Sequence, residues 1–260
     1  MTEDLQGTLS VVSHGHGSLL RSLLADLSHQ RGINAWLILV TLNIAEPFDP
    51  ADFPTLRLTI VRNPEPLGFG ANHNAAARIA QGALFLIVNP DIRLPDPDTM
   101  AQFTQLRWDA VPAPLRAPVV CAPDGSLEDS VRANLSPLNL LRRRHRKMNG
   151  WEVDPGDQGF FWLAGMFLVV PLAAFRAING FDERFRLYCE DYDLSARWRV
   201  MGGTVEIARN IRVVHDARRD SHRSWRHMRW HIASLARVWS SPAFWKVVTG
   251  HYPNAPSRSA

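Results

Sequence analysis

Polar side chains that could do chemistry follow directly after apolar runs in this chain. Ser13 and His14 end one such run, and Asn89 and Asp91 end another. Hydroxyl, imidazole, amide and carboxylate groups bind phosphates, sugars and divalent cations. If the runs are parallel strands, their carboxyl ends meet at one edge of a sheet, where α/β proteins bind ligands. The sequence therefore predicts a polar ligand site at that edge.

A glycine-rich segment follows a third apolar run and precedes an alanine-rich stretch. Arg62 ends the run, and Gly68, Phe69, Gly70 and Asn74 lie in the segment. Glycines let a backbone approach a ligand closely, and the first N–H groups of a helix attract phosphate. A tight loop that needs left-handed backbone explains the same glycines at least as well. The segment is thus a candidate phosphate site with a structural alternative.

A cluster of acids opens a predicted helix over residues 190–201. Glu190, Asp191 and Asp193 place three carboxylates within four positions. Acids at a helix N-terminus are stabilised by the helix dipole, so capping explains part of the cluster. Three acids exceed what one cap needs, which favours a functional role. Arg197 lies four residues after Asp193 on the same helical face, where the two can pair.

The elements that must position these residues alternate between strand and helix patterns. Strands are predicted over residues 9–12, 35–40, 56–61 and 84–88, and helices over 18–29 and 72–81. In the second half we expect a strand over 159–170, a helix over 171–179, and two short strands over 204–208 and 211–214 that lead to His215. The basic run 142–147 is predicted to be a solvated loop. This order predicts an α/β fold with a doubly wound, mostly parallel sheet and helices on both faces.

Several motifs occur together in a fixed order. They are RNPEPLGFGANHN over 62–74, LIVNPD over 86–91, GMFLVV over 165–170, NGFDERF over 179–185 and CEDYDLSAR over 189–197. In this order they resemble the bacterial glycosyltransferase family 2, especially its rhamnosyltransferase-like members. The resemblance implies a single GT-A domain over residues 1–215, with a nucleotide-sugar-binding half over about 1–94 and an acceptor half over 95–215.

The resemblance also implies a metal site and a catalytic base. Asp91 matches the second acid of the family's Asp-x-Asp motif, and Asn89 replaces the first. Together with His215, Asp91 would hold Mg²⁺ or Mn²⁺, the ions that suit carboxylate oxygens. Asp191 matches the general base, with Glu190 beside it in the catalytic pair. At the acceptor site the resemblance places Trp162, Gly165 and Asp193.

The donor site implied by the resemblance draws on the first half of the chain. It comprises Ser13, His14, Thr41, Asn43, Arg62, Gly68, Phe69, Gly70, Asn74, Asn89 and Asp91. Family members often carry an Asp after the second strand that binds the donor base. Thr41 and Asn43 stand in that region here, which leaves the nucleotide open between dTDP and UDP.

These roles describe a metal-dependent, inverting glycosyltransferase of surface polysaccharide biosynthesis. It would move a sugar, with rhamnose as the candidate, from a nucleotide-diphosphate donor to a glycan or polyprenyl-linked acceptor. A non-catalytic sugar-nucleotide or glycan-binding module with the same fold is the alternative, because the first acid of the metal motif is missing. A nucleic-acid binder is disfavoured, since residues 1–215 carry a net charge of −2.

Composition is consistent with a cytoplasmic protein. Of the 260 residues 46% are hydrophobic and 21% charged, which is ordinary for a globular chain. Cys121 and Cys189 are too few cysteines for a disulfide-stapled secreted scaffold. The N-terminus lacks the basic and apolar segments of a signal peptide, and the apolar stretch 160–175 is too short to span a membrane.

The C-terminal segment differs from the rest of the chain. Residues 216–260 carry eight Lys and Arg against two Asp, a net charge of +6. Apolar residues recur there at helical spacing, at Trp225, Met228, Ile232, Leu235 and Trp239. The segment is predicted to be a basic amphipathic helical extension. Packing onto the body and peripheral contact with the inner face of the cell membrane explain the stripe equally well.

Overall fold

A large central sheet organises the molecule. The computed structural model describes residues 5–145, 150–154, 159–216 and 225–253. Eight strands form the sheet: β1 (Gly7–Ser13), β2 (Trp36–Leu42), β3 (Arg57–Arg62), β4 (Leu84–Val88), β5 (Ile92–Arg93), β6 (Pro114–Cys121), β9 (Phe167–Pro171) and β10 (Thr204–His215). Their order is β3-β2-β1-β4-β9-β6-β10-β5. A separate two-stranded sheet pairs β7 (Val131–Ala133) with β8 (Phe161–Leu163).

The sheet is parallel in its first half and mixed in its second. The four strands β3, β2, β1 and β4 run parallel to their neighbours. Strand β9 is antiparallel to both β4 and β6, and β10 then runs parallel to β6. From β1 the chain adds β2 and then β3 on one side, and it adds β4 on the other side of β1. This reversal creates a crevice beyond the carboxyl ends of β1 and β4.

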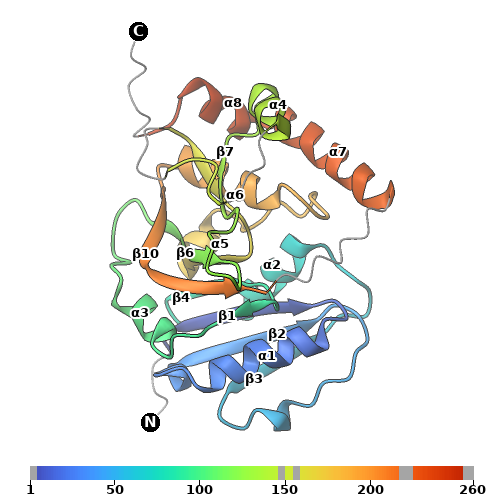
Figure 1. Cartoon of the computed structure of the whole chain (residues 1–260), viewed down its shortest axis with the longest axis vertical. Helices are drawn as coiled ribbons and strands as arrows, with labels where there is room; N and C mark the ends of the chain where they lie inside the picture. Colours follow the sequence, from blue (N-terminus) through green and yellow to red (C-terminus); the bar gives the residue numbers. More distant parts are fainter. Residues whose placement is uncertain (1–4, 146–149, 155–158, 217–224, 254–260) are drawn as a thin grey trace.

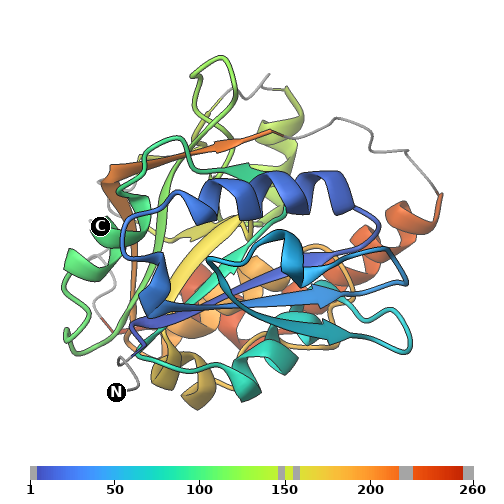
Figure 2. The ribbon, with the colours of Figure 1, turned by 90° about the horizontal axis from the view of Figure 1, so that it is seen from below.

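Helices cover both faces of the sheet (Figures 1 and 2). On one side lie α1 (Gly17–Ser28) and α3 (Thr99–Gln105), and on the other α2 (Phe69–Ile79), α5 (Leu172–Ala177) and α6 (Glu190–Val200). Alternate side chains of β4 feed the two cores: Leu86 and Val88 join the α1 side, Phe85 and Ile87 the α2 side. Burial on both faces explains why β4 is an uninterrupted apolar run. The predicted fold class is confirmed.

Helix α2 begins earlier than the sequence predicts. It starts at Phe69, so all of the glycine-rich segment after Gly68 lies within the helix and does not precede it as a loop. The N–H of Phe69 donates to the carbonyl of Arg186 at 3.3 Å, which satisfies an amide that the helix itself leaves unpaired. A contact distant in sequence therefore sets this helix start.

The predicted strand over 159–170 is wrong, because the chain forms two strands there. Strand β8 joins the small sheet and β9 the large one, with a break between Leu163 and Phe167. Within the break the carbonyl of Met166 accepts from the N–H of Asn89 at 2.9 Å. Conversely, the two short strands predicted before His215 are one strand, β10, with a register shift between Ala208 and Arg212.

The remaining helices form a layer beside the acceptor half. They are α4 (Pro137–His145), α7 (Trp225–Ser240) and α8 (Pro242–Thr249), which lie together at the top of Figure 1. The solvated loop predicted over 142–147 is therefore wrong up to His145, and the last two of its residues lie outside the described part. A third core joins these helices to α6, with buried Tyr192, Val238 and Phe244 at its centre.

The predicted amphipathic stripe of the tail divides into two parts. Leu235 and Trp239 pack against the third core. Trp225, Met228 and Ile232 are instead 86%, 56% and 61% exposed. Packing onto the body thus accounts for the C-terminal end of the stripe, and membrane contact stays a prediction for its exposed N-terminal end. Over the described residues no helix has the length and apolar character needed to cross a membrane.

Candidate active site

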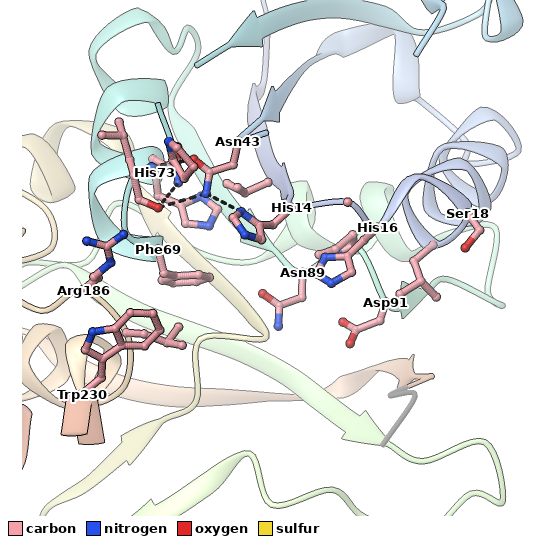
Figure 3. A pocket seen from close by; sticks show the side chains of 18 residues that line it. His14, His16, Ser18, Asn43, Phe69, His73, Asn89, Asp91, Arg186 and Trp230 are labelled. Carbon is pink, nitrogen blue, oxygen red and sulfur yellow. Dashed lines mark hydrogen bonds between the residues drawn. The ribbon is translucent and has the colours of Figure 1, made fainter. Parts of the chain in front are cut away.

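A cleft of about 870 Å³ opens at the crevice beyond β1 and β4. Five of the predicted donor-site residues line it: His14, Asn43, Phe69, Asn89 and Asp91 (Figure 3). They come from the ends of β1, β2 and β4 and from the start of α2. The structure thus brings together residues from four separate segments, as the strand-end argument requires.

Three other predicted donor residues lie beside the cleft. The Ser13 hydroxyl accepts from the N–H of His16 at 3.1 Å and so shapes the turn after β1. Thr41 is buried within β2. Arg62 lines a smaller neighbouring cavity of about 580 Å³ and donates to the carbonyl of Phe48 at 3.2 Å.

The glycines of α2 make close packing contacts. A Cβ on Gly68 would lie 2.7 Å from the carbonyl oxygen of Arg186, and one on Gly70 would lie 2.6 Å from Phe181. Asn74 accepts from the N–H of Phe181 at 2.9 Å and donates to its carbonyl at 2.8 Å. These three predicted donor residues therefore attach α2 to the chain segment before α6.

Asn43 organises one wall of the cleft. Its side-chain carbonyl accepts from Asn63 and from the N–H of Leu67 at 2.9 and 2.8 Å. Its amide donates to the carbonyl of Leu67 and to Nδ1 of His14 at 3.0 and 3.1 Å. The whole hydrogen-bonding capacity of Asn43 is therefore used within the protein. Because His14 Nδ1 accepts, neutral His14 carries its proton on Nε2, where it can donate to a ligand.

Asp91 and His215 meet at the opposite wall. His215 Nε2 lies 3.2 Å from Asp91 Oδ2, and His215 Nδ1 lies 3.9 Å from Glu128. The other oxygen, Asp91 Oδ1, is buried without a hydrogen-bond partner among the described residues. Burial lowers the pKa of His215, but the hydrogen bond and charge of Asp91 outweigh that effect and hold the pKa above its usual value.

The adjacent carboxyl groups of Glu190 and Asp191 have different surroundings. Glu190 is buried, and burial followed by the charge of Asp191 raises its pKa to about 8. Asp191 is partly exposed and accepts from the N–H groups of Gly165 and Tyr192 at 3.0 and 2.9 Å. Burial raises the pKa of Asp191 too, whereas the charge of Arg132 and the two N–H groups limit the rise. Arg132 and the two N–H groups therefore favour the charged form of Asp191.

Asp191 lies one contact away from the cleft. A Cβ on Gly165 would be 3.3 Å from the ring of Phe69 and 3.7 Å from Cβ of Asp191. Gly165 thus separates the carboxylate from an aromatic side chain that lines the cleft. The break between β8 and β9 places Gly165 at this position.

The other two predicted acceptor residues are structural in their contacts. Asp193 is buried and pairs with Arg197 at 2.6 Å, which confirms the predicted pairing on one helical face. Trp162 is 3% exposed, donates from its indole N–H to the carbonyl of Ala133, and packs against Tyr192. Neither residue lines the cleft.

Sequence reasoning missed several residues that line the cleft, namely His16, Leu67, His73, Arg186 and Trp230. His73 lies in the quoted glycine-rich motif, and burial lowers its pKa to about 3, so it is neutral. Its neighbour Ser10 bonds Nδ1 at 2.8 Å. Arg186 and Trp230 come from segments whose proximity no sequence spacing could reveal.

This arrangement can bind a phosphorylated ligand beside an ionisable carboxylate. Solved structures of other proteins share the fold. The mannosyltransferase PcManGT from Pyrobaculum calidifontis, in complex with GDP-Man and Mn²⁺, matches 95% of this chain and 69% of its own at a TM-score of 0.63 and 17% identity. S. aureus TarS in complex with UDP-GlcNAc matches 83% of this chain and 59% of its own at a TM-score of 0.58 and 12% identity. The fold is that of a GT-A glycosyltransferase.

Sequence comparison identifies the family. No family model matches the chain. Rhamnosyltransferase WbbL of Escherichia coli (strain K12) is 34% identical over 267 residues, which cover 87% of this chain and 90% of that protein. N-acetylglucosaminyl-diphospho-decaprenol L-rhamnosyltransferase of Mycobacterium tuberculosis is 29% identical over 126 residues, 43% of this chain and 40% of its own. The chain belongs to the rhamnosyltransferase-like members of glycosyltransferase family 2.

Proposed function

We propose that the protein transfers a sugar, with rhamnose as the first candidate, from a dTDP- or UDP-linked donor to a glycan or polyprenyl-linked acceptor of surface polysaccharide biosynthesis. The observation that carries the proposal is the position of Asp191, which is separated only by Gly165 from the cleft-lining ring of Phe69. The names of the two relatives, both rhamnosyltransferases, support the sugar, and the mycobacterial name supports a lipid-linked acceptor.

The proposed reaction is a single displacement with inversion. The Asp191 carboxylate takes the proton of an acceptor hydroxyl while that oxygen attacks the anomeric carbon. The bond from this carbon to the donor diphosphate breaks on the opposite side, and the nucleoside diphosphate leaves with the bonding electrons. A buried, protonated Glu190 beside it adds no second negative charge, which leaves Asp191 as the base.

Asp91 and His215 are the proposed holders of Mg²⁺ or Mn²⁺. Asp91 Oδ1 is buried and without a partner in the described part of the chain, and His215 lies against the other oxygen. Among the described residues no three His, Cys, Asp or Glu side chains are placed to hold a metal ion together, so donor phosphates would complete the shell. The carboxylate suits Mg²⁺ or Mn²⁺. The ion would supply positive charge beside the departing diphosphate.

Calorimetry with dTDP, UDP and their sugars tests this function. The wild-type protein should bind at least one nucleotide more tightly in Mn²⁺ than in EDTA, and Asp91→Ala should abolish that difference. Asp109→Ala, at a 76% exposed side chain, is the matched control and should behave as wild type. Equal affinity in Mn²⁺ and EDTA would refute the metal site. Nucleotide binding without turnover on any acceptor would favour the non-catalytic module.

The proposal includes peripheral attachment to the inner face of the cell membrane. Exposed large apolar side chains gather on α4, α7 and α8, namely Leu138, Leu141, Trp225, Met228, Ile232 and Trp245. The segment that contains α7 and α8 carries a net charge of +6, which attracts anionic lipid. Apolar and basic residues combined on helices that lie together are typical of interfacial membrane contact.

A further inference from the structure

We propose that Arg186, held against the ring of Trp230, binds a diphosphate group at the rim of the cleft. Arg186 precedes α6, and Trp230 belongs to α7 in the C-terminal extension. Both side chains line the cleft, and the guanidinium carbon lies 5.3 Å from the centre of the indole ring. Figure 3 shows them on the far side of Phe69 from Asp91. The extension therefore contributes a wall to the cleft of the first half.

The backbone of Arg186 is fixed at this rim. Its carbonyl accepts from the N–H of Phe69 at 3.3 Å. Its carbonyl oxygen also approaches Gly68 so closely that a Cβ there would lie 2.7 Å away. The first turn of α2 thus fixes the backbone of Arg186, and the side chain extends from there to Trp230 on α7.

The charges of the cleft fit a diphosphate. Among the described residues that line it, Asp91 is the one carboxylate and Arg186 the one guanidinium. No carboxylate in the described part of the chain pairs with Arg186. A divalent cation at Asp91 leaves one positive charge there, and Arg186 adds another. Together they place two positive charges where a diphosphate would lie, and Arg binds phosphate oxygens through paired N–H donors.

Trp230 acts through Arg186 as a positioning residue. A flat indole ring attracts the face of a guanidinium and leaves its N–H edge available for phosphate oxygens. An arginine held in this way loses less side-chain freedom on binding than a free one. The inference rests on the proposed function, because two sources of diphosphate meet in such an enzyme: the nucleotide donor and the lipid-linked acceptor.

The experiment compares Arg186→Gln and Trp230→Leu with wild type by calorimetry, in Mn²⁺, with two probes. One probe is dTDP or UDP, and the other is a short-chain prenyl diphosphate. Arg186→Gln should weaken binding of at least one probe by about 10- to 100-fold, the usual effect of losing hydrogen bonds to a charged group. Arg186→Lys should recover part of the loss. Trp230→Phe should bind more tightly than Trp230→Leu, since it keeps an aromatic face.

Two matched controls separate this role from general effects. Arg78→Gln removes a charge at a 69% exposed side chain outside the cleft, and Trp225→Leu alters an 86% exposed indole on the same helix. Both should bind as wild type does. If Arg186→Gln binds both probes like wild type, the inference is wrong while the proposed function stands. If wild type itself binds neither probe, the proposed function fails and the inference with it.

Discussion

The carboxyl groups of Glu190 and Asp191 differ in the backbone N–H groups that reach them and in their burial. Asp191 accepts two N–H groups, whereas Glu190 Oε2 is buried with no partner among the described residues. Hydrogen bonds from N–H groups stabilise a carboxylate, and burial without them stabilises the neutral acid. These surroundings favour a proton on Glu190 and a negative charge on Asp191.

Replacing Asp191 by Asn should reduce turnover by about 10²- to 10⁴-fold, the usual contribution of a positioned general base. Donor affinity should stay near wild type, because Asp191 does not line the cleft. The measurement is steady-state transfer together with calorimetry of the donor. Asp154→Asn makes the same change at a 60% exposed side chain and should leave both unchanged. Near-normal turnover in Asp191→Asn would assign the base to another acid.

The pair also predicts a pH dependence of stability. The folded state raises the pKa of Glu190 from 4.5 to about 8, so it keeps a proton that the unfolded chain has lost between these values. The contribution of Glu190 to the free energy of unfolding therefore falls as pH rises through that window. Glu190→Gln removes the dependence, so its stability relative to wild type should increase with pH. Urea unfolding across this range measures the difference.

The matched control for that series is Glu65→Gln, which removes one carboxylate from an exposed side chain. If the stability difference between Glu190→Gln and wild type is the same at every pH, the proton does not reside on Glu190.

At the scale of elements, local pattern predicted most of the sheet and little of the site's fine geometry. Strand β4 matches its predicted range because an apolar run buried on both faces has one structural solution. The apolar pattern over 159–170 fits one long strand and two short strands equally well. Contacts of Gly165 and Met166 decide between these two outcomes. Helix α4 was missed because its basic residues dominate its composition. Tertiary contacts such as those of Gly165 and Met166 leave no pattern in the local sequence.

The first turn of α2 gives a prediction of its own. Gly68→Ala should lower the free energy of unfolding by about 1–3 kcal/mol, the usual cost of overpacking, because the new Cβ meets the Arg186 backbone. Urea denaturation measures this loss. Gly17→Ala is the control, since its Cβ would meet only the flexible end of Glu46 at 3.2 Å and alanine favours a helix start. Equal stability of the two variants would mean that Arg186 is not fixed by α2.

At the scale of the whole molecule, the C-terminal extension is part of the folded body. Its residues Val238, Phe244 and Val247 are buried in the third core with α6, and the indole of Trp239 donates to the carbonyl of Leu135 at 2.9 Å. Removing the extension would expose that core. Tests of membrane contact therefore require surface variants and not truncation.

The double variant Met228→Ser/Ile232→Ser should lose flotation with anionic liposomes by about 10-fold or more, because each apolar side chain contributes about 1.5–3 kcal/mol when buried. Its melting temperature should not change, since both side chains are more than half exposed. Ile79→Ser/Val111→Ser makes the same kind of change at exposed residues outside the three helices and should still float. Flotation of the first variant at the wild-type level would contradict membrane contact through α7.

Helix α7 presents Trp230 to the cleft and Met228 and Ile232 to the exterior. Because a short helix is rigid, a ligand that fixes the position of one of its faces also fixes the position of the other. Thermodynamic reciprocity then requires two factors to be equal. One is the change that membrane contact makes in the affinity for diphosphate, and the other is the change that diphosphate makes in the affinity for the membrane. If the two proposed contacts favour each other, molecules already loaded with donor would stay longer at the bilayer than empty ones. The population that meets a lipid-borne acceptor would thus be enriched in enzyme ready to react.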